Sequence, residues 1–317
     1  MEDNILQVSV ILCTHNPKPD LLSEVLRHLK NQTLSKDRWE LIIVDNCSNP
    51  PLHLSAEQSW HSNLQHLSEK KLGQIFARIT GIQAAKGKLI VFVDDDNLLQ
   101  PDYLEVALSI AADHPFLGAF GGSCEGLFAH PPAAWQLPWI DILAVREVKC
   151  DLWANFAYWP CMPLGAGMIL KKEVAIRHIK KLKEEKKLLK LSRYGTNLMS
   201  GDDVDMVLTC LENGGACGVF RSLRLTHVIP ANRLGDEYHL QLTAGIHASS
   251  AWQIYVRQGP SAVKFHYALR PLFTALKEGL KFRQHAWRSV VFEIQRLWAI
   301  RKGYAIAKKM IRHDQQD

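Results

Sequence analysis

Residues 89–97 have the sequence LIVFVDDDN, in which five apolar residues are followed directly by three aspartates and an asparagine. A short apolar run of this kind predicts a strand that is buried on both faces, as in parallel sheets. Three adjacent carboxylates repel one another unless a cation lies among them, and hard divalent ions prefer carboxylate oxygens. The stretch therefore predicts a buried strand that ends at a metal-binding segment. An acidic loop that caps the next helix has the same composition and is the alternative.

The same arrangement, a buried strand that leads into polar residues, occurs twice earlier in the chain. The apolar run 8–12 leads into Thr-His-Asn at 14–16, and the run 41–44 leads into Asp-Asn at 45–46. In open parallel sheets, ligands bind at the carboxyl ends of the strands. We therefore expect these polar segments and the acidic triplet to line one binding site.

Apolar residues at helical spacing predict helices between and after these strands. Asp20 is expected to cap the first helix, and Gly87 is expected to stop a second helix over residues 69–85. Further helices are expected over residues 103–112, 180–190 and 202–211, and a strand from Val219 to His227. The alternation predicts an α/β fold with a mostly parallel, Rossmann-like sheet flanked by helices. From residue 235 the pattern is wholly helical, so we expect a catalytic domain over 1–234 and a helical C-terminal region over 235–317.

Composition narrows the class of protein. The 317 residues are 47% apolar and 22% charged, as in soluble globular proteins. None of the seven cysteines forms a CxxC pair, which argues against a zinc knuckle or a disulfide framework and favours the cytoplasm. The N-terminus is acidic where a secretory signal would be basic, and no apolar stretch approaches the ~18 residues of a spanning helix. A membrane-spanning protein is therefore not expected.

The positive charge of the chain is concentrated at its end. Residues 261–317 carry twelve Lys or Arg and four Asp or Glu, whereas the whole chain has a net charge of +6. An apolar stripe that includes Trp287, Ile294 and Trp298 is flanked by these basic residues. A basic amphipathic helix of this type predicts contact with an anionic membrane surface, or a helix packed on the catalytic domain with a solvated basic face. Nucleic-acid binding is not expected, because no recognised binding motif accompanies the charge.

Six segments, taken together and in this order, resemble the motifs of family 2 glycosyltransferases. They are 8–16 (VSVILCTHN), 43–48 (IVDNCS), 76–87 (FARITGIQAAKG), 92–97 (FVDDDN), 165–168 (GAGM) and 200–206 (SGDDVDM). The resemblance covers about residues 5–230, and it departs from the family pattern at His15 (usually aromatic), Thr80 and Asp202 (usually Glu). Residues 284–288 lack the Gln-x-x-Arg-Trp motif of polymerising members, which favours transfer of a single sugar.

The resemblance implies a GT-A type domain that transfers a sugar with inversion and needs Mn²⁺ or Mg²⁺. It assigns the metal to Asp94, Asp96 and His227. It assigns the nucleotide sugar to Thr14, His15, Asn16, Asp45, Arg78, Asp94, Asp95 and Gly167. Residues i and i+2 of an extended segment share a side, so Asp94 and Asp96 are expected to converge and Asp95 to point away. A sugar hydroxyl is a poor nucleophile and needs a general base, for which Asp203 is favoured over its neighbour Asp202; both carboxylates also suit a helix N-terminus.

The expected donor is a nucleoside-diphosphate sugar, with a UDP-sugar favoured. The expected acceptor is a glycan or a lipid-linked acceptor in the synthesis of cell-surface polysaccharide or lipid-linked glycan. An aromatic-rich stretch is expected to shape the acceptor site or to fill the core: Trp135, Trp139, Trp153, Tyr158 and Trp159. A sugar-1-phosphate nucleotidyltransferase is one alternative, but residues 14–17 (THNP) lack the Gly-rich, basic phosphate loop of that class. A non-catalytic nucleotide-sugar-binding protein of the same fold is the other alternative.

Overall fold

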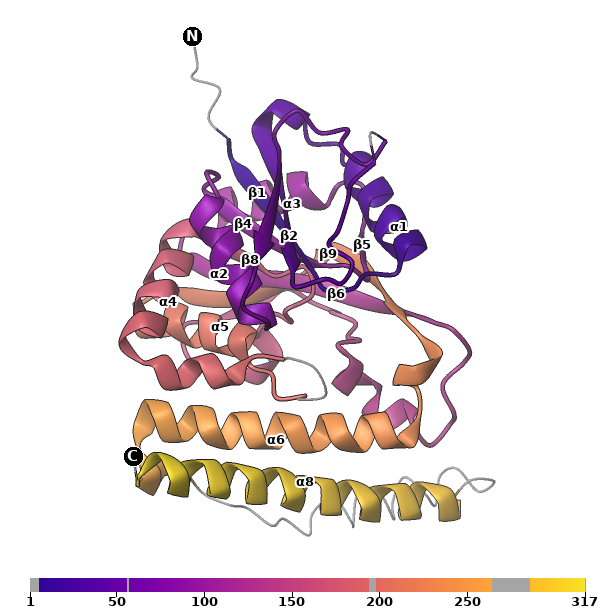
Figure 1. The fold of residues 1–317 in the computed structure, drawn as a ribbon, viewed down its shortest axis with the longest axis vertical. Helices are drawn as coiled ribbons and strands as arrows, with labels where there is room; N and C mark the ends of the chain where they lie inside the picture. The colour runs from indigo at the N-terminus through magenta and orange to yellow at the C-terminus, as the bar shows by residue number, and fades with distance from the viewer. Residues whose placement is uncertain (1–5, 56, 194–197, 264–285, 317) are drawn as a thin grey trace. The chain divides into compact units, whose positions relative to one another are not determined.

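The computed structural model describes residues 6–55, 57–193, 198–263 and 286–316. Residue contacts divide the chain into two compact units. The first unit comprises residues 1–127, 144–186 and 202–228, and the second comprises 128–143, 187–201 and 229–317. The first unit holds the sheet and the predicted site, and the second is mainly helical (Figure 1).

The described residues of the first unit form a nine-stranded sheet in the order β3-β2-β1-β4-β8-β6-β9-β5, with β7 paired to β9. Its parallel half consists of β1 (Val8–Thr14), β2 (Trp39–Asn46), β3 (Leu64–Glu69) and β4 (Leu89–Asp94). The remaining strands are β5 (Asn97–Leu99), β6 (Leu117–Phe128), β7 (Leu152–Ala154), β8 (Ile169–Lys171) and β9 (Ala216–Ile229). Strand β8 is antiparallel to β4 and β6, and β9 is antiparallel to β5 and β7. The fold is therefore α/β with a parallel N-terminal half, as expected.

Alternation along the buried strands separates the core into two layers, one on each face of the sheet. On one face, Val10 and Leu12 of β1 pack with helices α1 (Pro19–Lys30) and α3 (Tyr103–Asp113). On the other face, Ile11 packs with α2 (Gln74–Ala84), α4 (Lys172–Glu184) and α5 (Asp202–Glu212). Both faces are covered, so the inner parallel strands β1, β2 and β4 are mainly apolar along their length rather than alternating.

The second unit is built on two long helices that lie side by side, α6 (Asp236–Gln258) and α8 (Ala286–Asp314) (Figure 1). Small residues of α8 face α6, and a Cβ atom on Gly303 would lie 2.3 Å from the carbonyl oxygen of Ala244. At the end of α8, the carboxylate of Asp314 accepts a hydrogen bond from the Tyr255 hydroxyl at 2.7 Å and pairs with Lys187 at 2.8 Å. The side chain of Trp287, predicted in the apolar stripe, lies outside the described residues.

Three of the predicted helix boundaries are wrong. Helix α1 begins at Pro19, so Asp20 lies inside its first turn rather than at the cap. The helix predicted over 69–85 begins only at Gln74, because Gly73 has a φ of 137°, which a helix cannot contain, and Glu69 ends strand β3. Gly87 does not stop this helix, which ends at Ala84; it lies against β1, where an added Cβ would be 2.5 Å from the carbonyl carbon of Val8.

The lysine-rich stretch 180–190 is also divided differently from the prediction. Its first residues belong to the last turn of α4, and a separate 3₁₀ helix follows over Lys186–Leu191. The buried side chains of Leu182 and Leu188 anchor the two pieces, so the segment is not a single solvated helix.

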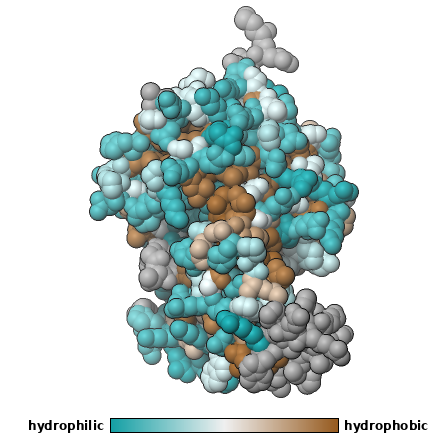
Figure 2. Space-filling model, turned by 90° about the vertical axis from the view of Figure 1, so that its right-hand side faces the viewer, coloured by the Kyte–Doolittle hydropathy of each residue, from teal (hydrophilic) through white to brown (hydrophobic). Residues whose placement is uncertain are grey.

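The predicted aromatic-rich stretch does not behave as one group. In the second unit, Trp135 and Trp139 lie under the guanidinium groups of Arg288 and Arg296, at 4.2 Å and 3.9 Å from the ring centroids. In the first unit, the side chains of Trp153, Tyr158 and Trp159 are about half exposed or more. Apolar surface appears in patches among hydrophilic residues on the face drawn in Figure 2. Among the described helices, none is both long and apolar enough to cross a bilayer.

Candidate functional site

The register of the parallel strands brings the predicted polar segments together. Thr14 at the end of β1 pairs with Asp45 of β2, and the preceding residue, Cys13, pairs with Asp94 of β4. The three strands therefore end at the same level of the sheet, where bound ligands are usual in this architecture. This is the convergence that the sequence predicts for residues 14–16, 45–46 and 94–97.

Asp45 shapes the loop that follows β2. Its two carboxylate oxygens accept hydrogen bonds from the backbone N–H groups of Ser48 (3.1 Å) and Leu52 (2.9 Å). Burial opposes ionisation of this carboxyl, but the hydrogen bonds from Ser48 and Leu52 outweigh that effect and hold the pKa of Asp45 below its ordinary value. Asp45 is therefore a charged, preorganised carboxylate at the strand end.

The polar residues after β1 tie this loop to the neighbouring one. Nδ1 of His15 donates a hydrogen bond to the carbonyl oxygen of Asn46 at 2.6 Å. Asn16, with a φ of 49°, receives a hydrogen bond from the N–H of Asn49 at its Oδ1 atom (2.7 Å), and its own N–H donates to Ser48 (2.8 Å). His15 and Asn16 are thus exposed residues that close one side of the site.

The acidic triplet does not continue as an extended segment. Strand β4 ends at Asp94, and Asp95 and Asp96 form a turn before β5. The alternation of side-chain directions in an extended strand, on which the prediction for Asp94, Asp95 and Asp96 was based, therefore does not apply across these three residues. The three carboxylates have different neighbours: Gln74 donates to Asp94 at 2.9 Å, the Thr14 hydroxyl donates to Asp95, and the Asn97 amide donates to Asp96 at 3.0 Å.

Asp96 and His227 lie next to each other. Pairing of β5 with β9 places His227 opposite Asn97, and the N–H of Val228 donates to the carbonyl oxygen of Asp96 at 2.9 Å. Nε2 of His227 is 3.4 Å from Oδ2 of Asp96, and both side chains are about 10% exposed. Among the described residues, no group of three or more His, Cys, Asp or Glu side chains is arranged to hold a metal ion. The structure thus places two of the three predicted ligands side by side.

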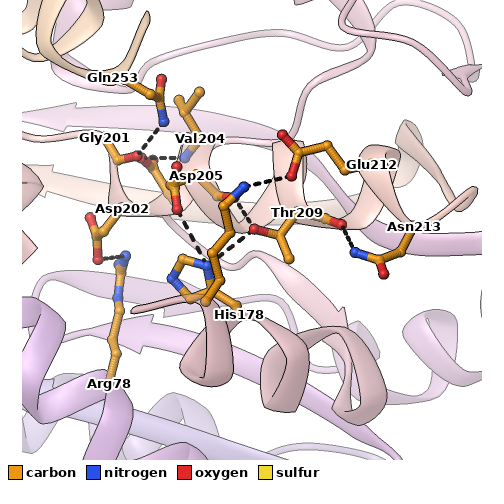
Figure 3. Close-up of polar contacts among 12 residues, drawn as sticks. Arg78, His178, Gly201, Asp202, Val204, Asp205, Thr209, Glu212, Asn213 and Gln253 are labelled. Carbon is orange, nitrogen blue, oxygen red and sulfur yellow. Dashed lines mark hydrogen bonds and ion pairs between the residues drawn. The ribbon is translucent and has the colours of Figure 1, made fainter. Parts of the chain in front are cut away.

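Arg78 connects the acidic turn to helix α5. It projects from α2 with 3% of its side chain exposed, and its Nη1 is 2.8 Å from the Asp202 carboxylate (Figure 3). Its Nη2 is 3.7 Å from Oδ1 of Asp94. Burial disfavours the charged form, but the negative charges of Asp202, Asp94 and Asp203 outweigh burial and raise the pKa of Arg78. Arg78 is therefore a buried cation shared by two carboxylates and not an exposed residue on a helix surface.

The first turn of α5 carries three aspartates with different surroundings. Asp202 is buried against Arg78, and Asp205 is buried with Oδ2 3.5 Å from Nδ1 of His178 on α4 (Figure 3). The carboxylate of Asp203 lies against the backbone of Gly165, where an added Cβ would be 2.8 Å from its Oδ2 atom. Of the two predicted bases, Asp202 is thus paired with Arg78, whereas the Asp203 carboxylate accepts the N–H of Val204 at 2.8 Å.

The small-residue segment 165–167 is a turn that precedes β8, which begins at Ile169. Gly167 has a φ of 70°, and its carbonyl oxygen accepts a hydrogen bond from the buried Tyr103 hydroxyl at 2.7 Å. A Cβ at Gly167 would lie 2.6 Å from that hydroxyl oxygen. The turn is therefore fixed from beneath by α3 while it supports Asp203 through Gly165.

Comparison with known proteins identifies the domain that carries this site. Residues 9–141 match the model of the family described as Glycosyl transferase family 2. This N-terminal part of the chain is therefore similar to glycosyl transferase family 2. Among curated relatives, the putative glycosyltransferase EpsH of Bacillus subtilis is 33% identical over 110 residues, which is 33% of this chain and 30% of EpsH. Human polypeptide N-acetylgalactosaminyltransferase 15 is 24% identical over 265 residues, 76% of this chain. The chain spans 37% of the length of that human relative.

Solved structures of low sequence identity share the fold of this chain. Staphylococcus aureus TarS in complex with UDP-GlcNAc matches with a TM-score of 0.54 at 14% identity, over 94% of this chain and 92% of TarS. The mannosyltransferase PcManGT of Pyrobaculum calidifontis, in complex with GDP-Man and Mn²⁺, matches with a TM-score of 0.53 at 18% identity, over 96% of this chain and 75% of PcManGT. These matches support the GT-A fold.

Two residues of the site were not predicted from the sequence. Gln74 contacts Asp94 from the first turn of α2, and it lies four residues before Arg78, so both side chains share one helix face. Asn97 receives the N–H of Asp94 at its Oδ1 atom (3.2 Å) and donates to Asp96. The i, i+4 spacing was a usable signal for Gln74. Asn97 was quoted within the acidic motif but carried no assigned role.

Proposed function

We propose that this chain transfers a single sugar from a nucleoside-diphosphate sugar to an acceptor hydroxyl with inversion, and that Asp203 is the general base. The observation that carries the proposal is that Asp202 and Asp203, in the first turn of α5, have different neighbours. Asp202 is neutralised by Arg78 at 2.8 Å, whereas the Asp203 carboxylate rests on a glycine turn. A carboxylate of that kind can accept the proton of an acceptor hydroxyl as its oxygen attacks the anomeric carbon. The bond from that carbon to the diphosphate breaks on the opposite face, so the configuration inverts.

We assign the donor to the ends of β1, β2 and β4, through Thr14, His15, Asn16, Asp45, Arg78, Asp94, Asp95 and Gly167. Asp45 is charged and points from a strand end, which suits a hydrogen bond from the imide of a uracil base, so a UDP-sugar remains the favoured donor. The structures of TarS and PcManGT, which share this fold, are complexes with UDP-GlcNAc and GDP-Man, respectively. A nucleoside-diphosphate sugar is the class that these observations share.

The residues at the acidic turn suit a divalent ion, Mn²⁺ or Mg²⁺. Asp96 and His227 approach within 3.4 Å, so one carboxylate and one imidazole can serve a single ion, and Asp94 lies two residues before Asp96 at the end of β4. Carboxylate oxygen with imidazole nitrogen fits Mn²⁺ better than Mg²⁺, which prefers oxygen ligands alone. When bound, such an ion supplies positive charge against a diphosphate leaving group.

The acceptor in this proposal is a glycan or a lipid-linked glycan of cell-surface polysaccharide, modified in the cytoplasm at the inner face of a membrane. All seven cysteines are free, which suits a reducing compartment. The exposed aromatic side chains of Trp153, Tyr158 and Trp159 lie on the chain just before the turn that supports Asp203, and aromatic faces suit the C–H faces of sugar rings.

The test is donor binding and transfer measured separately. Purified protein is mixed with Mn²⁺ and UDP or GDP for thermal-shift measurements, and with a panel of nucleotide sugars and glycan acceptors for release of nucleoside diphosphate. We expect Asp203→Asn to keep nucleotide binding and lose transfer, and Asp96→Ala to lose metal-dependent binding. Asp20→Asn, which changes an exposed first-turn carboxylate of α1, is the matched control and should behave as wild type. Absence of stabilisation by every nucleotide with metal would refute the donor assignment, and normal transfer by Asp203→Asn would refute the base.

A further inference from the structure

Helix α8 presents a basic face to solvent. At about 100° per residue, its exposed side chains between residues 294 and 313 all fall within about 80° of the direction of Trp298. Five of them are cationic: Arg301, Lys302, Lys308, Lys309 and Arg312. Residues 294–313 contain no Asp or Glu. We call this side of the helix, from Ile294 to His313, the outer face of α8.

Large apolar side chains share the outer face with these cations. Trp298 is 65% exposed, the highest value among the large hydrophobic residues of the described chain, and Ile294 and Ile306 are 42% and 38% exposed. The guanidinium carbon of Arg301 lies 5.3 Å from the Trp298 ring centroid. Exposed tryptophan and isoleucine among basic residues are typical of helices that lie in the interface of an anionic membrane.

The inner face of α8, opposite the outer face, is already buried. The outer face can therefore bind a partner without any refolding of α8. Phe292, Ala299 and Ala307 are buried, and Gly303 lies against Ala244 of α6. Of the two acidic residues that flank the outer face, Glu293 is buried and accepts two hydrogen bonds of 2.9 Å from Arg296, and Asp314 pairs with Lys187. The amphipathic arrangement is therefore part of the folded unit rather than a property of an isolated helix.

Charge and composition decide among the possible occupants. A second copy of this chain would bring the same five cations face to face, and like charges across an interface are unfavourable. Residues 264–285 carry five Lys or Arg and one Glu, so electrostatics do not favour this segment either. A nucleic acid would satisfy the cations, but it offers no apolar layer for Ile294, Trp298 and Ile306. Anionic lipid offers both phosphate and acyl chains.

We propose that the outer face of α8 binds the surface of an anionic phospholipid bilayer, with the basic residues at the headgroups and Trp298, Ile294 and Ile306 at the boundary with the acyl chains. Clusters of four to eight basic residues on an amphipathic helix bind anionic lipid in this way, and each cation near the surface strengthens binding by about fivefold. This inference rests on the geometry of α8 and is independent of the roles proposed for Asp203 and the metal ligands.

The test is co-sedimentation of the full chain with vesicles of phosphatidylcholine alone, or of phosphatidylcholine and phosphatidylglycerol in equal parts. We expect binding to the anionic vesicles only, weakened by salt. The triple variant Lys302→Gln/Lys309→Gln/Arg312→Gln should weaken binding by on the order of 100-fold. The matched control Arg177→Gln/Lys180→Gln/Lys183→Gln removes three exposed cations from α4 and should bind as wild type. Trp298→Ala should weaken binding, and Ile176→Ala, an apolar control on α4 that is 53% exposed, should not.

Equal loss of binding in both triple variants would overturn the proposal, because the attraction would then follow net charge and not the outer face of α8. Binding of an unrelated duplex DNA without binding of anionic vesicles would overturn it in favour of a nucleic acid. The assay reads membrane binding alone, and Asp203→Asn should bind vesicles as wild type. A negative result here therefore leaves the transfer reaction untouched, and loss of transfer leaves this result untouched.

Discussion

Replacing Arg78 by methionine removes the cation that the structure buries between α2 and α5. Asp202 would keep only 4% of its side chain exposed while losing a guanidinium nitrogen at 2.8 Å. At an effective dielectric constant of about 20, two unit charges 4 Å apart attract by about 4 kcal/mol. Removal of one partner of a buried pair costs about 3–5 kcal/mol, because the other charge stays buried without compensation. We therefore expect Arg78→Met to lower the free energy of unfolding by about 3–5 kcal/mol.

The assay is urea unfolding followed by tryptophan fluorescence, for Arg78→Met, Asp202→Leu and the double variant. Asp202→Leu should cost less than Arg78→Met, because Arg78 retains Asp94 at 3.7 Å. The double variant leaves no unpaired charge at the Asp202 position, so its loss should fall short of the sum of the single losses by about 2–3 kcal/mol. Arg27→Met, which breaks an exposed pair with Glu24 on α1, is the control and should leave the unfolding midpoint unchanged.

Additive losses in the double variant would show that Arg78 and Asp202 do not stabilise each other, and the account of the buried pair would be wrong. A loss below about 1 kcal/mol for Arg78→Met would have the same meaning, since that is the range of solvent-exposed pairs. In either case, the argument that Asp202 is neutralised and that Asp203 is left as base would lose its support.

Three further predictions concern single side chains of the first unit. Gly165→Ala places a Cβ 2.8 Å from Oδ2 of Asp203; the carboxylate can rotate away, so the melting temperature should hardly change, while a displacement of this size should slow transfer by up to about 100-fold. His178→Leu removes the imidazole 3.5 Å from the buried Asp205 carboxylate and should cost about 1–3 kcal/mol, with faster amide exchange in the first turn of α5 as the signature. Asp45 has a lowered pKa, so its ionised form stabilises the fold above the unfolded-state value and this gain disappears as the pH falls through the folded-state value. The stability difference between wild type and Asp45→Asn should therefore shrink as the pH falls from neutral into the acidic range in which Asp45 is protonated, and a difference independent of pH would contradict this prediction.

The parallel half of the sheet was predictable because each of its inner strands is a continuous apolar run. Val8–Leu12, Leu41–Val44 and Leu89–Val93 are buried on both faces, and this burial removes the alternation that would otherwise leave their type open. Strand β3 was missed because Leu64–Glu69 lies at the sheet edge with exposed polar residues, and the helical pattern after it extends back over its last residue. The conformation of Gly73, with its φ of 137°, prevents α2 from extending back to β3.

The antiparallel half was predictable only in part. Strands β6, β7 and β8 were not predicted, because β7 and β8 are three residues long and the glycines of β6 give no side-chain pattern. An added Cβ on Gly122 would lie 1.9 Å from the carbonyl oxygen of Leu223. This glycine is therefore required by the close approach of a neighbouring strand that is distant in the sequence. Such a cause cannot be seen from local spacing.

The positions of the site residues were predictable, but their partners were not. Strand ends placed Asp45 and Asp94 at one edge of the sheet, which the register shows, and Nη2 of Arg78 lies 3.7 Å from Oδ1 of Asp94. That Arg78 pairs with Asp202, 124 residues away, depends on how α2 and α5 pack on the same face. The roles proposed for these residues stay predictions until binding and transfer are measured.

The close approach of α8 to α6 also sets how α8 can vary. Ala299, Gly303 and Ala307 recur every four residues along the inner side, but Gly303 is the one glycine of Ala286–Asp314, and it is the residue at the carbonyl of Ala244. A shift of α8 by one turn in either direction would bring the methyl group of an alanine to that carbonyl. Gly303 therefore fixes both the position of α8 along α6 and the rotation of α8 about its own axis. Residues on the outer side can then be substituted without any change in the direction in which they point.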